Sequence, residues 1–347
     1  MVSVAGSILA AVFVAQTILA PLSATDRLAP SNLYPNSVFA RPIPANPPLH
    51  PRSSAIVARL LSASAGYTDV RNDAAGGDWN YPIYVGTAND PAYTVKCTKP
   101  WGKCNVQNTT VHIPAYAKTE RGEDGHLDVV DLATGYEYNF WQAGDRSGNP
   151  NISGGALLIS WGGRTKLGGS ALAAEGNHAG YAASAIALYP AEILAGHIDH
   201  ALGLDVRCAD EPTVFPAILH ATDGPCNAAD SPYYGMLIQL NMSDAEIDAL
   251  NTSRYDKVIK KALAHYGAYV YDVGADNSFL MLSYLSYTTQ GLADPWIGTI
   301  LPDMRKYGVA QGGGDRWQLG PMFGGLGIFD WTSKLRIIAP CVAAKNC

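Results

Sequence analysis

The sequence predicts a mainly β protein, a jelly-roll-like β-sandwich with a few decorating helices. From Trp79 to His112, aromatic and β-branched residues alternate between turn-forming Gly, Asn, Asp and Pro, a pattern typical of short strands. A well-defined β-hairpin follows, and only a few later segments carry the start and stop signals of helices. Many short strands with few helices favour a sandwich of packed sheets.

Residues 1–24 predict a signal peptide. Val2 to Leu22 form an almost uncharged apolar run, and the small residues that a signal peptidase needs follow at Ser23 and Ala24. An uncleaved membrane anchor stays open as an alternative, because the run is nearly long enough to cross a bilayer. No later segment is long and apolar enough to do so. We therefore expect a secreted protein, extracellular or at the cell surface, with no membrane contact after signal removal.

The six cysteines indicate an oxidising compartment, because they follow a predicted export signal. They fall as neighbours in the chain, so local disulfides are the simplest interpretation, although the sequence does not fix the pairing. The pairs are Cys97 with Cys104, Cys208 with Cys226, and Cys341 with Cys347. None of these spacings resembles a structural zinc site.

The composition and charge of the chain indicate its domain organisation and limit its expected partners. Residues 25–52 are rich in proline and are expected to form an extended linker or strap. Residues 53–347 are expected to fold as a single β-rich globular domain, since a sandwich with long loops absorbs this length. The formal net charge is −6, and the basic residues are scattered. Nucleic acid is excluded as a partner because no basic stripe is present to displace phosphate counterions.

The hairpin consists of residues 126–131 and 136–141, joined by a loop in which Gly135 can adopt the positive φ of such a turn. If Asp131 pairs with Tyr136, one face of the hairpin is apolar and is expected to face the core. Because side chains alternate along a strand, the other face carries polar groups. The core face comprises Leu127, Val129, Tyr138 and Phe140. The polar face comprises His126, Asp128, Glu137, Asn139 and Trp141, with Asp124 in line.

Two helices are expected in the first half and the centre of the chain. The first begins at Ser53, where serine caps precede an apolar face. The second is expected over residues 190–202, because Pro190 suits a first helical turn. On this helix His197 and His200 would share one face.

Further along the chain, Ser243 and Glu246 form a capping-box pattern. A longer helix is expected from about Ser253, with Gly267 as the residue that ends it. A strand is expected over residues 268–273, where apolar and aromatic residues alternate.

The polar face of the hairpin has the composition of a glycan cleft. Acid–base groups stand beside an aromatic ring on which a sugar can stack, and Trp161 is expected to add a second aromatic wall. An ordinary solvated sheet face is the alternative. The expected substrate-binding residues are Asp128, Glu137, Asn139, Trp141 and Trp161.

The histidines offer further chemistry. His197 and His200 at helical spacing would reach a shared ligand, but a zinc site needs at least one more ligand and the chain has no HExxH motif. We therefore expect no metal and no other cofactor. His220 can exchange protons near neutral pH, and Tyr266 can act as an acid when a neighbour stabilises its phenolate.

Several blocks together resemble a group of exported microbial proteins of unassigned activity. The blocks are Asp124-Gly125-His126, the segment from Glu192 to His200-Ala201-Leu202, Pro216-Ala217 ahead of His220, and Tyr266-Gly267 with Asp272. The resemblance covers roughly residues 110–280 in separated pieces, and its order implies that Asp124, His126, Glu192, His200 and His220 converge. The relatives place an Arg-Tyr pair just before the acidic residue, where this chain has Tyr189-Pro190-Ala191-Glu192. Another residue must fill the role of that arginine, or the role is missing.

The leading hypothesis is a secreted carbohydrate-active enzyme that cleaves an extracellular polysaccharide or oligosaccharide. Hydrolysis needs two carboxyl groups from the pool of Asp124, Glu137 and Glu192. Elimination needs His200 or His126 as a base and Tyr266 as an acid. The alternatives are a non-catalytic glycan-binding or surface protein, and a metal-dependent hydrolase built on the histidine pair. The expected catalytic residues are Asp124, His126, Glu192, His200, His220 and Tyr266.

Overall fold

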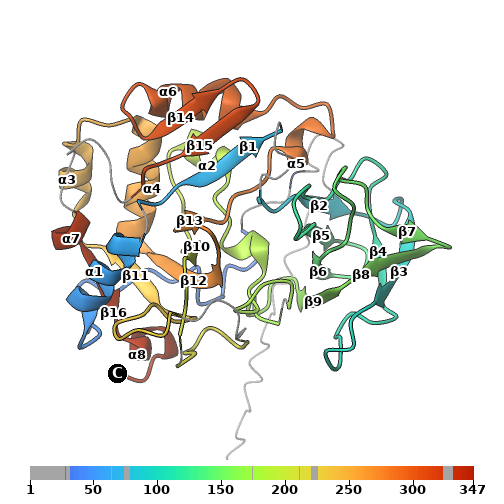
Figure 1. Cartoon of the computed structure of the whole chain (residues 1–347), viewed down its shortest axis with the longest axis horizontal. Coiled ribbons are helices and arrows are strands. Elements are labelled where there is room, and N and C mark those ends of the chain that lie inside the picture. Colours follow the sequence, from blue (N-terminus) through green and yellow to red (C-terminus); the bar gives the residue numbers. More distant parts are fainter. Residues whose placement is uncertain are drawn as a thin grey trace, which may run out of the picture.

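The chain is mainly β, with several sheets and a few short helices (Figure 1). The predicted signal peptide and His220 lie outside the residues that the computed structural model describes. These are residue 28 and residues 32–63, 65–73, 79–173, 175–210, 212–219, 226–322 and 331–347.

Residues 83–166, here called the strand lobe, form two sheets that enclose their own apolar core. The first sheet has the order β2-β5-β6-β9 and the second the order β4-β3-β8-β7. The strands are β2 (Ile83–Gly86), β3 (Ala92–Cys97), β4 (Thr110–His112), β5 (Leu127–Asp131), β6 (Tyr136–Trp141), β7 (Ile152–Ser153), β8 (Ala156–Ile159) and β9 (Trp161–Lys166).

The hairpin β5–β6 has the predicted register, with Asp131 opposite Tyr136 and Leu127 opposite Phe140. Its apolar face packs in the core of the strand lobe, as predicted. The polar face is not open over most of its length, contrary to expectation. Asp128, Glu137 and Asn139 are all 0% exposed, so the first sheet is covered on both sides.

The rest of the chain, here called the mixed lobe, holds a five-stranded sheet in the order β13-β10-β12-β11-β16 and a three-stranded sheet in the order β1-β15-β14. Strands β10 and β12 run parallel and are neighbours. The strands are β1 (Thr68–Asn72), β10 (Leu202–Val206), β11 (Leu237–Leu240), β12 (Ala268–Val273), β13 (Ser278–Phe279), β14 (Ala310–Gly313), β15 (Arg316–Leu319) and β16 (Leu335–Ile338). The two lobes lie side by side (Figure 1).

The helices decorate the mixed lobe (Figure 1). They are α1 (Ser53–Ala63), α2 (Pro190–Ala195), α3 (Asp244–Asp248), α4 (Arg254–His265), α5 (Leu285–Thr288), α6 (Leu301–Arg305), α7 (Trp331–Lys334) and α8 (Pro340–Ala344), with single turns η1 (Ala183–Ala185) and η2 (Trp296–Ile300). The helix start at Ser53, the capping box of Ser243 with Glu246, and the helix from Ser253 with Gly267 after its end are confirmed.

The helix expected over residues 190–202 is much shorter. It ends at Ala195, because Gly196 adopts a left-handed conformation with φ 91° and its backbone N–H caps the last turn. His197 and His200 therefore do not share a helical face, and Leu202 already belongs to strand β10.

The proline-rich segment runs along the mixed lobe as a strap. Phe39 is fully buried between Tyr181 and Tyr269, and the backbone of Ile43 bonds to that of His265. Disulfides join the three pairs of neighbouring cysteines, Cys97–Cys104, Cys208–Cys226 and Cys341–Cys347. Among the described residues, no helix combines the length and the apolar character needed to cross a bilayer.

Candidate functional site

Three tryptophans form an aromatic surface at one end of the first sheet, here called the Trp platform. Trp141 and Trp161 lie opposite each other on the paired strands β6 and β9. Trp101 packs against both, with ring centroids 5.5 Å from Trp141 and 6.0 Å from Trp161, and it is 58% exposed. The loop that carries Trp101 is closed by the Cys97–Cys104 disulfide. Large aromatic rings held at the surface mark a contact surface, since rings of this size are usually buried.

The indoles of the Trp platform are held by carboxyl groups. Trp141 Nε1 donates to Asp124 Oδ1 over 2.8 Å. Trp161 donates to the side chain of Glu175, which also accepts from the amide of Asn105. Burial raises the pKa of Glu175, although both hydrogen bonds oppose the change. The platform therefore combines fixed apolar rings with two carboxyl groups at their edges.

A polar groove of about 550 Å³ adjoins the platform. It begins at Gln142 and Ser160, the neighbours of Trp141 and Trp161 in the chain, whose side chains are joined by a hydrogen bond of 2.6 Å. Glu123 also lines the groove and forms an ion pair with Arg146. A cavity of this size accommodates a small-molecule or oligosaccharide ligand.

The backbone at Glu175 and Gly176 seals the centre of the polar hairpin face. A Cβ atom on Gly163 would lie 2.2 Å from the backbone nitrogen of Glu175, and one on Gly176 would lie 2.9 Å from Asn139. The chain therefore rests directly on the sheet at this point. Only the end of the face that carries the Trp platform remains accessible.

Asp128 and Glu137 form a sealed carboxyl pair below this cover. Glu137 accepts from the Tyr34 hydroxyl at 2.9 Å and from the backbone and hydroxyl of Ser184. Burial raises the pKa of Glu137, and burial together with the charge of Glu137 raises the pKa of Asp128. Substrate does not reach these two residues or Asn139 in this structure, so they lie outside the candidate site, contrary to the sequence-based expectation.

A cluster of acid–base groups lies where the two lobes meet, here called the acid–base cluster: Asp124, His126, His178, Asp205 and Asp272. His126, only 7% exposed, stacks on Tyr81 with ring centroids 4.1 Å apart. Burial lowers the pKa of His126, and the charges of Asp124 and Asp272 partly oppose this change.

Two carboxyl groups of the acid–base cluster come from the neighbouring parallel strands β10 and β12. Asp205 is aligned with Asp272 in the sheet, and like charges at this separation resist joint ionisation. Burial and the charge of Asp272 raise the pKa of Asp205 to about 8, although Ser278 donates to it over 2.9 Å. His178 Nδ1 lies 2.9 Å from Asp272 Oδ1. The cluster therefore combines a carboxyl group with a raised pKa, Asp205, and an imidazole with a lowered pKa, His126.

The other sequence-predicted site residues lie apart from Asp124 and His126. Glu192 and His200 pair with each other, with Oε2 and Nε2 3.0 Å apart. Burial lowers the pKa of His200, but the hydrogen bond and charge of Glu192 outweigh it and the pKa is raised. Tyr266 caps the end of α4. In the part of the chain that the structure describes, no hydrogen bond or ion pair links these three residues to Asp124 or His126.

Sequence reasoning missed Trp101, Glu175, His178 and Asp205. Trp101 had a readable signal, because a tryptophan inside a disulfide-closed loop is held at the surface. The other three had none. They reach the site through strand pairing and through a covering segment, both of which depend on contacts between distant parts of the chain.

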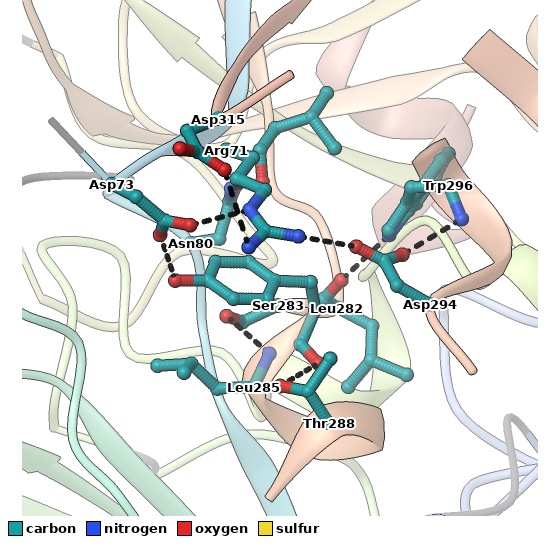
Figure 2. Close-up of polar contacts among 12 residues, drawn as sticks. Arg71, Asp73, Asn80, Leu282, Ser283, Leu285, Thr288, Asp294, Trp296 and Asp315 are labelled. Carbon is teal, nitrogen blue, oxygen red and sulfur yellow. Dashed lines mark hydrogen bonds and ion pairs between the residues drawn. The ribbon is translucent and has the colours of Figure 1, made fainter. Parts of the chain in front are cut away.

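A network around Arg71 holds the Asp124 loop to the mixed lobe. Figure 2 shows the Arg71 guanidinium between Asp73, Asp294 and Asp315. Its Nε donates to Asp73 over 2.6 Å, and Tyr284, below the guanidinium, also donates to Asp73. Arg121, three residues before Asp124, donates to the Tyr284 hydroxyl over 2.7 Å. The network thus fixes the loop that positions the acidic residue of the platform.

The described residues contain no group of three or more His, Cys, Asp or Glu side chains arranged to hold a metal ion. Comparison with protein-family models gave no match, and comparisons with curated proteins and with solved structures gave none either.

Proposed function

We propose that this protein is a secreted carbohydrate-active enzyme that binds an extracellular polysaccharide on the Trp platform and cleaves it beside Asp124. The observation that supports this most is the 2.8 Å hydrogen bond from the Trp141 indole to Asp124. It joins an exposed surface suited to sugar rings to a carboxyl group that also borders the acid–base cluster. The same bond fixes the carboxyl group relative to the ring plane, as catalytic positioning requires.

Each part of the surface has a role in this proposal. The rings stack on the apolar faces of sugars, and the polar groove receives their hydroxyl groups. Asp124 exchanges protons with the substrate directly, and His126 does so after a local movement that exposes it, which serves either hydrolysis or elimination of a uronate polymer.

The wider setting fits the same proposal. The three disulfides are compatible with an oxidising, extracellular environment. A jelly-roll-like sandwich and kinship with the exported microbial group remain part of the proposal, as does cleavage of the signal peptide.

Incubation of the secreted protein with a polysaccharide panel tests the proposal. We expect new reducing ends with at least one polymer, and loss of both binding and cleavage in Trp141→Ala. Tyr307→Ala, which removes an exposed aromatic ring outside the platform, is the matched control and should behave as the wild type. A panel that yields neither product nor binding would refute the proposal.

A non-catalytic glycan-binding protein is the second candidate, and the burial of His126 favours it. An enclosed imidazole stacked on Tyr81 does not reach a polymer without local movement. Binding that depends on Trp141, with no product after prolonged incubation and no change in His126→Gln, would support this candidate.

A further inference from the structure

We propose, resting on the function proposed above, that Glu175 and Asp124 are the two catalytic carboxyl groups of a glycoside hydrolase. In this scheme Glu175 is the general acid, Asp124 is the general base, and the scissile bond lies over the Trp141–Trp161 pair. The proposal adds a residue that the sequence did not suggest and selects hydrolysis over elimination.

The arrangement of the two indoles carries the inference. Trp141 and Trp161 face each other across β6 and β9, and each is bonded at its edge to a different carboxyl group. Asp124 reaches Trp141 from the loop before β5, whereas Glu175 reaches Trp161 from the segment that covers the sheet. A sugar ring on this pair would thus have one carboxyl group on each side, as glycosidic cleavage requires.

The surroundings of Glu175 suit the role of a general acid. Burial raises the pKa of Glu175, which favours the protonated form that an acid needs. Asp124 is half-buried, and its side chain accepts a hydrogen bond from the Trp141 indole, which is a donor only, so Asp124 stands beside the ring on the side opposite to Glu175 in this scheme.

His126 provides a second and independent sign of a ligand at this place. It is 7% exposed, and its Nδ1 has no hydrogen-bond partner among the described residues. A buried polar atom without a partner is costly and is common where a substrate or water completes the site. The charge of Asp124 acts on this imidazole, so His126 belongs to the surroundings of the proposed base.

The reaction balances without a cofactor. Glu175 transfers its proton to the glycosidic oxygen as the bond from that oxygen to the anomeric carbon breaks. A water molecule adds to the anomeric carbon and gives its proton to Asp124. One C–O bond breaks and one forms, and exchange with solvent returns the two carboxyl groups to their starting protonation states.

The charges near the platform favour a neutral glycan. Asp124 carries an acidic group, the charges of Glu123 and Arg146 offset each other in an ion pair, and Glu175 is protonated in this scheme. The Lys99 ammonium lies over the ring of Trp101, with its Nζ 5.9 Å from the ring centroid. It is a cation in direct contact with the platform. Elimination requires a bound uronate whose own carboxylate is neutralised, and the acidic group of Asp124 opposes this.

The test compares substrates with poor and good leaving groups. The wild type, Glu175→Gln and Asp124→Asn are assayed on the neutral polysaccharide that the panel identifies and on a dinitrophenyl glycoside of its released oligosaccharide. Dinitrophenolate leaves without a proton, so its release does not need a general acid. The hydrolysis rate of Glu175→Gln should therefore fall about 10²- to 10⁴-fold on the polymer but about tenfold or less on the aryl glycoside. The hydrolysis rate of Asp124→Asn should fall about 10²-fold or more on both substrates.

Asp248→Asn, an exposed acid on α3, is the control and should retain full activity on both substrates. Retained turnover of the aryl glycoside also shows that Glu175→Gln is folded. Three results would overturn the inference. The activity of Glu175→Gln could fall by the same factor on both substrates, its activity could be unchanged on both, or the products of the wild type could be unsaturated uronates. In each of these cases the wild type still cleaves a glycan, so the proposed function survives. A wild type that cleaves no glycan overturns the inference together with the enzymatic function.

Discussion

Asp205 and Asp272 are adjacent carboxyl groups on parallel strands, and their proximity makes folding sensitive to pH. The pKa of Asp205 is about 8 in the folded protein and 3.8 in its ordinary state. Between these values the folded chain holds a proton that the unfolded chain has lost, so the free energy of unfolding decreases as pH rises. Below both values and above both values the contribution of Asp205 does not change.

We therefore predict that the wild type loses stability relative to Asp205→Asn, by roughly 1 kcal/mol per pH unit, between about pH 5 and about pH 7. Urea unfolding at several pH values, with the disulfides intact, measures this difference. Parallel pH profiles for the two proteins would contradict the assigned proton on Asp205.

Two buried tyrosines give opposite predictions for removal of a hydroxyl group. Tyr284 donates to Asp73 and accepts from Arg121, whereas the Tyr181 hydroxyl has no partner among the described residues. Tyr284→Phe should lower the free energy of unfolding by about 1–3 kcal/mol, because charged partners lose a buried hydrogen bond. Tyr181→Phe, the matched control, should be neutral or stabilising. Equal losses in thermal unfolding would show that the Arg71 network does not join the lobes.

At the scale of residues, part of the site could be predicted. Asp124, His126 and Trp141 lie together because they belong to one hairpin face and its flanking loop, which the alternation of strand side chains makes readable. Asp205 and Glu175 could not be predicted. Their positions depend on a parallel pairing of distant strands and on a covering segment, and neither leaves a local pattern.

The disulfide-closed loop of residues 97–104 is the element that holds Trp101 at the surface. The double variant Cys97→Ser/Cys104→Ser should bind the glycan about tenfold more weakly, because ordering the freed loop costs about 1.4 kcal/mol on binding. The control is Cys341→Ser/Cys347→Ser, which opens the disulfide at the C-terminal end. Isothermal titration calorimetry of both variants with the glycan measures the two affinities, and the control should bind as tightly as the wild type. Unchanged affinity in the first variant would exclude Trp101 from the binding surface.

The segment that covers the first sheet requires glycine beneath it. Gly163→Ala places a Cβ atom 2.2 Å from the Glu175 backbone, so we expect a loss of about 1–3 kcal/mol in the free energy of unfolding. In Gly298→Ala, the control, the new Cβ atom within η2 enters open space, so the substitution should be neutral or slightly stabilising. Matching denaturation midpoints for the two variants would contradict the close contact between cover and sheet.

The sequence predicts some helices and strands more accurately than others. The hairpin register follows from its own alternation, and the capping box of Ser243 fixes the start of α3. Helix α2 is shorter than the helix expected over residues 190–202 because Gly196 adopts a left-handed conformation that caps its end. A glycine followed by a polar segment ends a helix when the left-handed conformation provides a cap.

For the whole molecule, the β character was predictable and the topology was not. The parallel pairs β2–β5, β3–β8 and β10–β12 join segments far apart in the chain, and hydrophobic patterns carry no information on such partners. The same long-range packing decides which polar face is open. The expected glycan cleft is therefore confined to one end of its sheet, where the tryptophans lie.

The central claim is that a glycan binds on Trp101, Trp141 and Trp161. Indole N–H signals in nitrogen–proton correlation spectra, followed during titration with the neutral oligosaccharide, test this most directly. We expect these three signals to shift with one common affinity. The signal of Trp296, which is fully buried and donates to the Leu282 carbonyl over 3.0 Å, should stay fixed. Binding that leaves the three platform signals unmoved would contradict this claim.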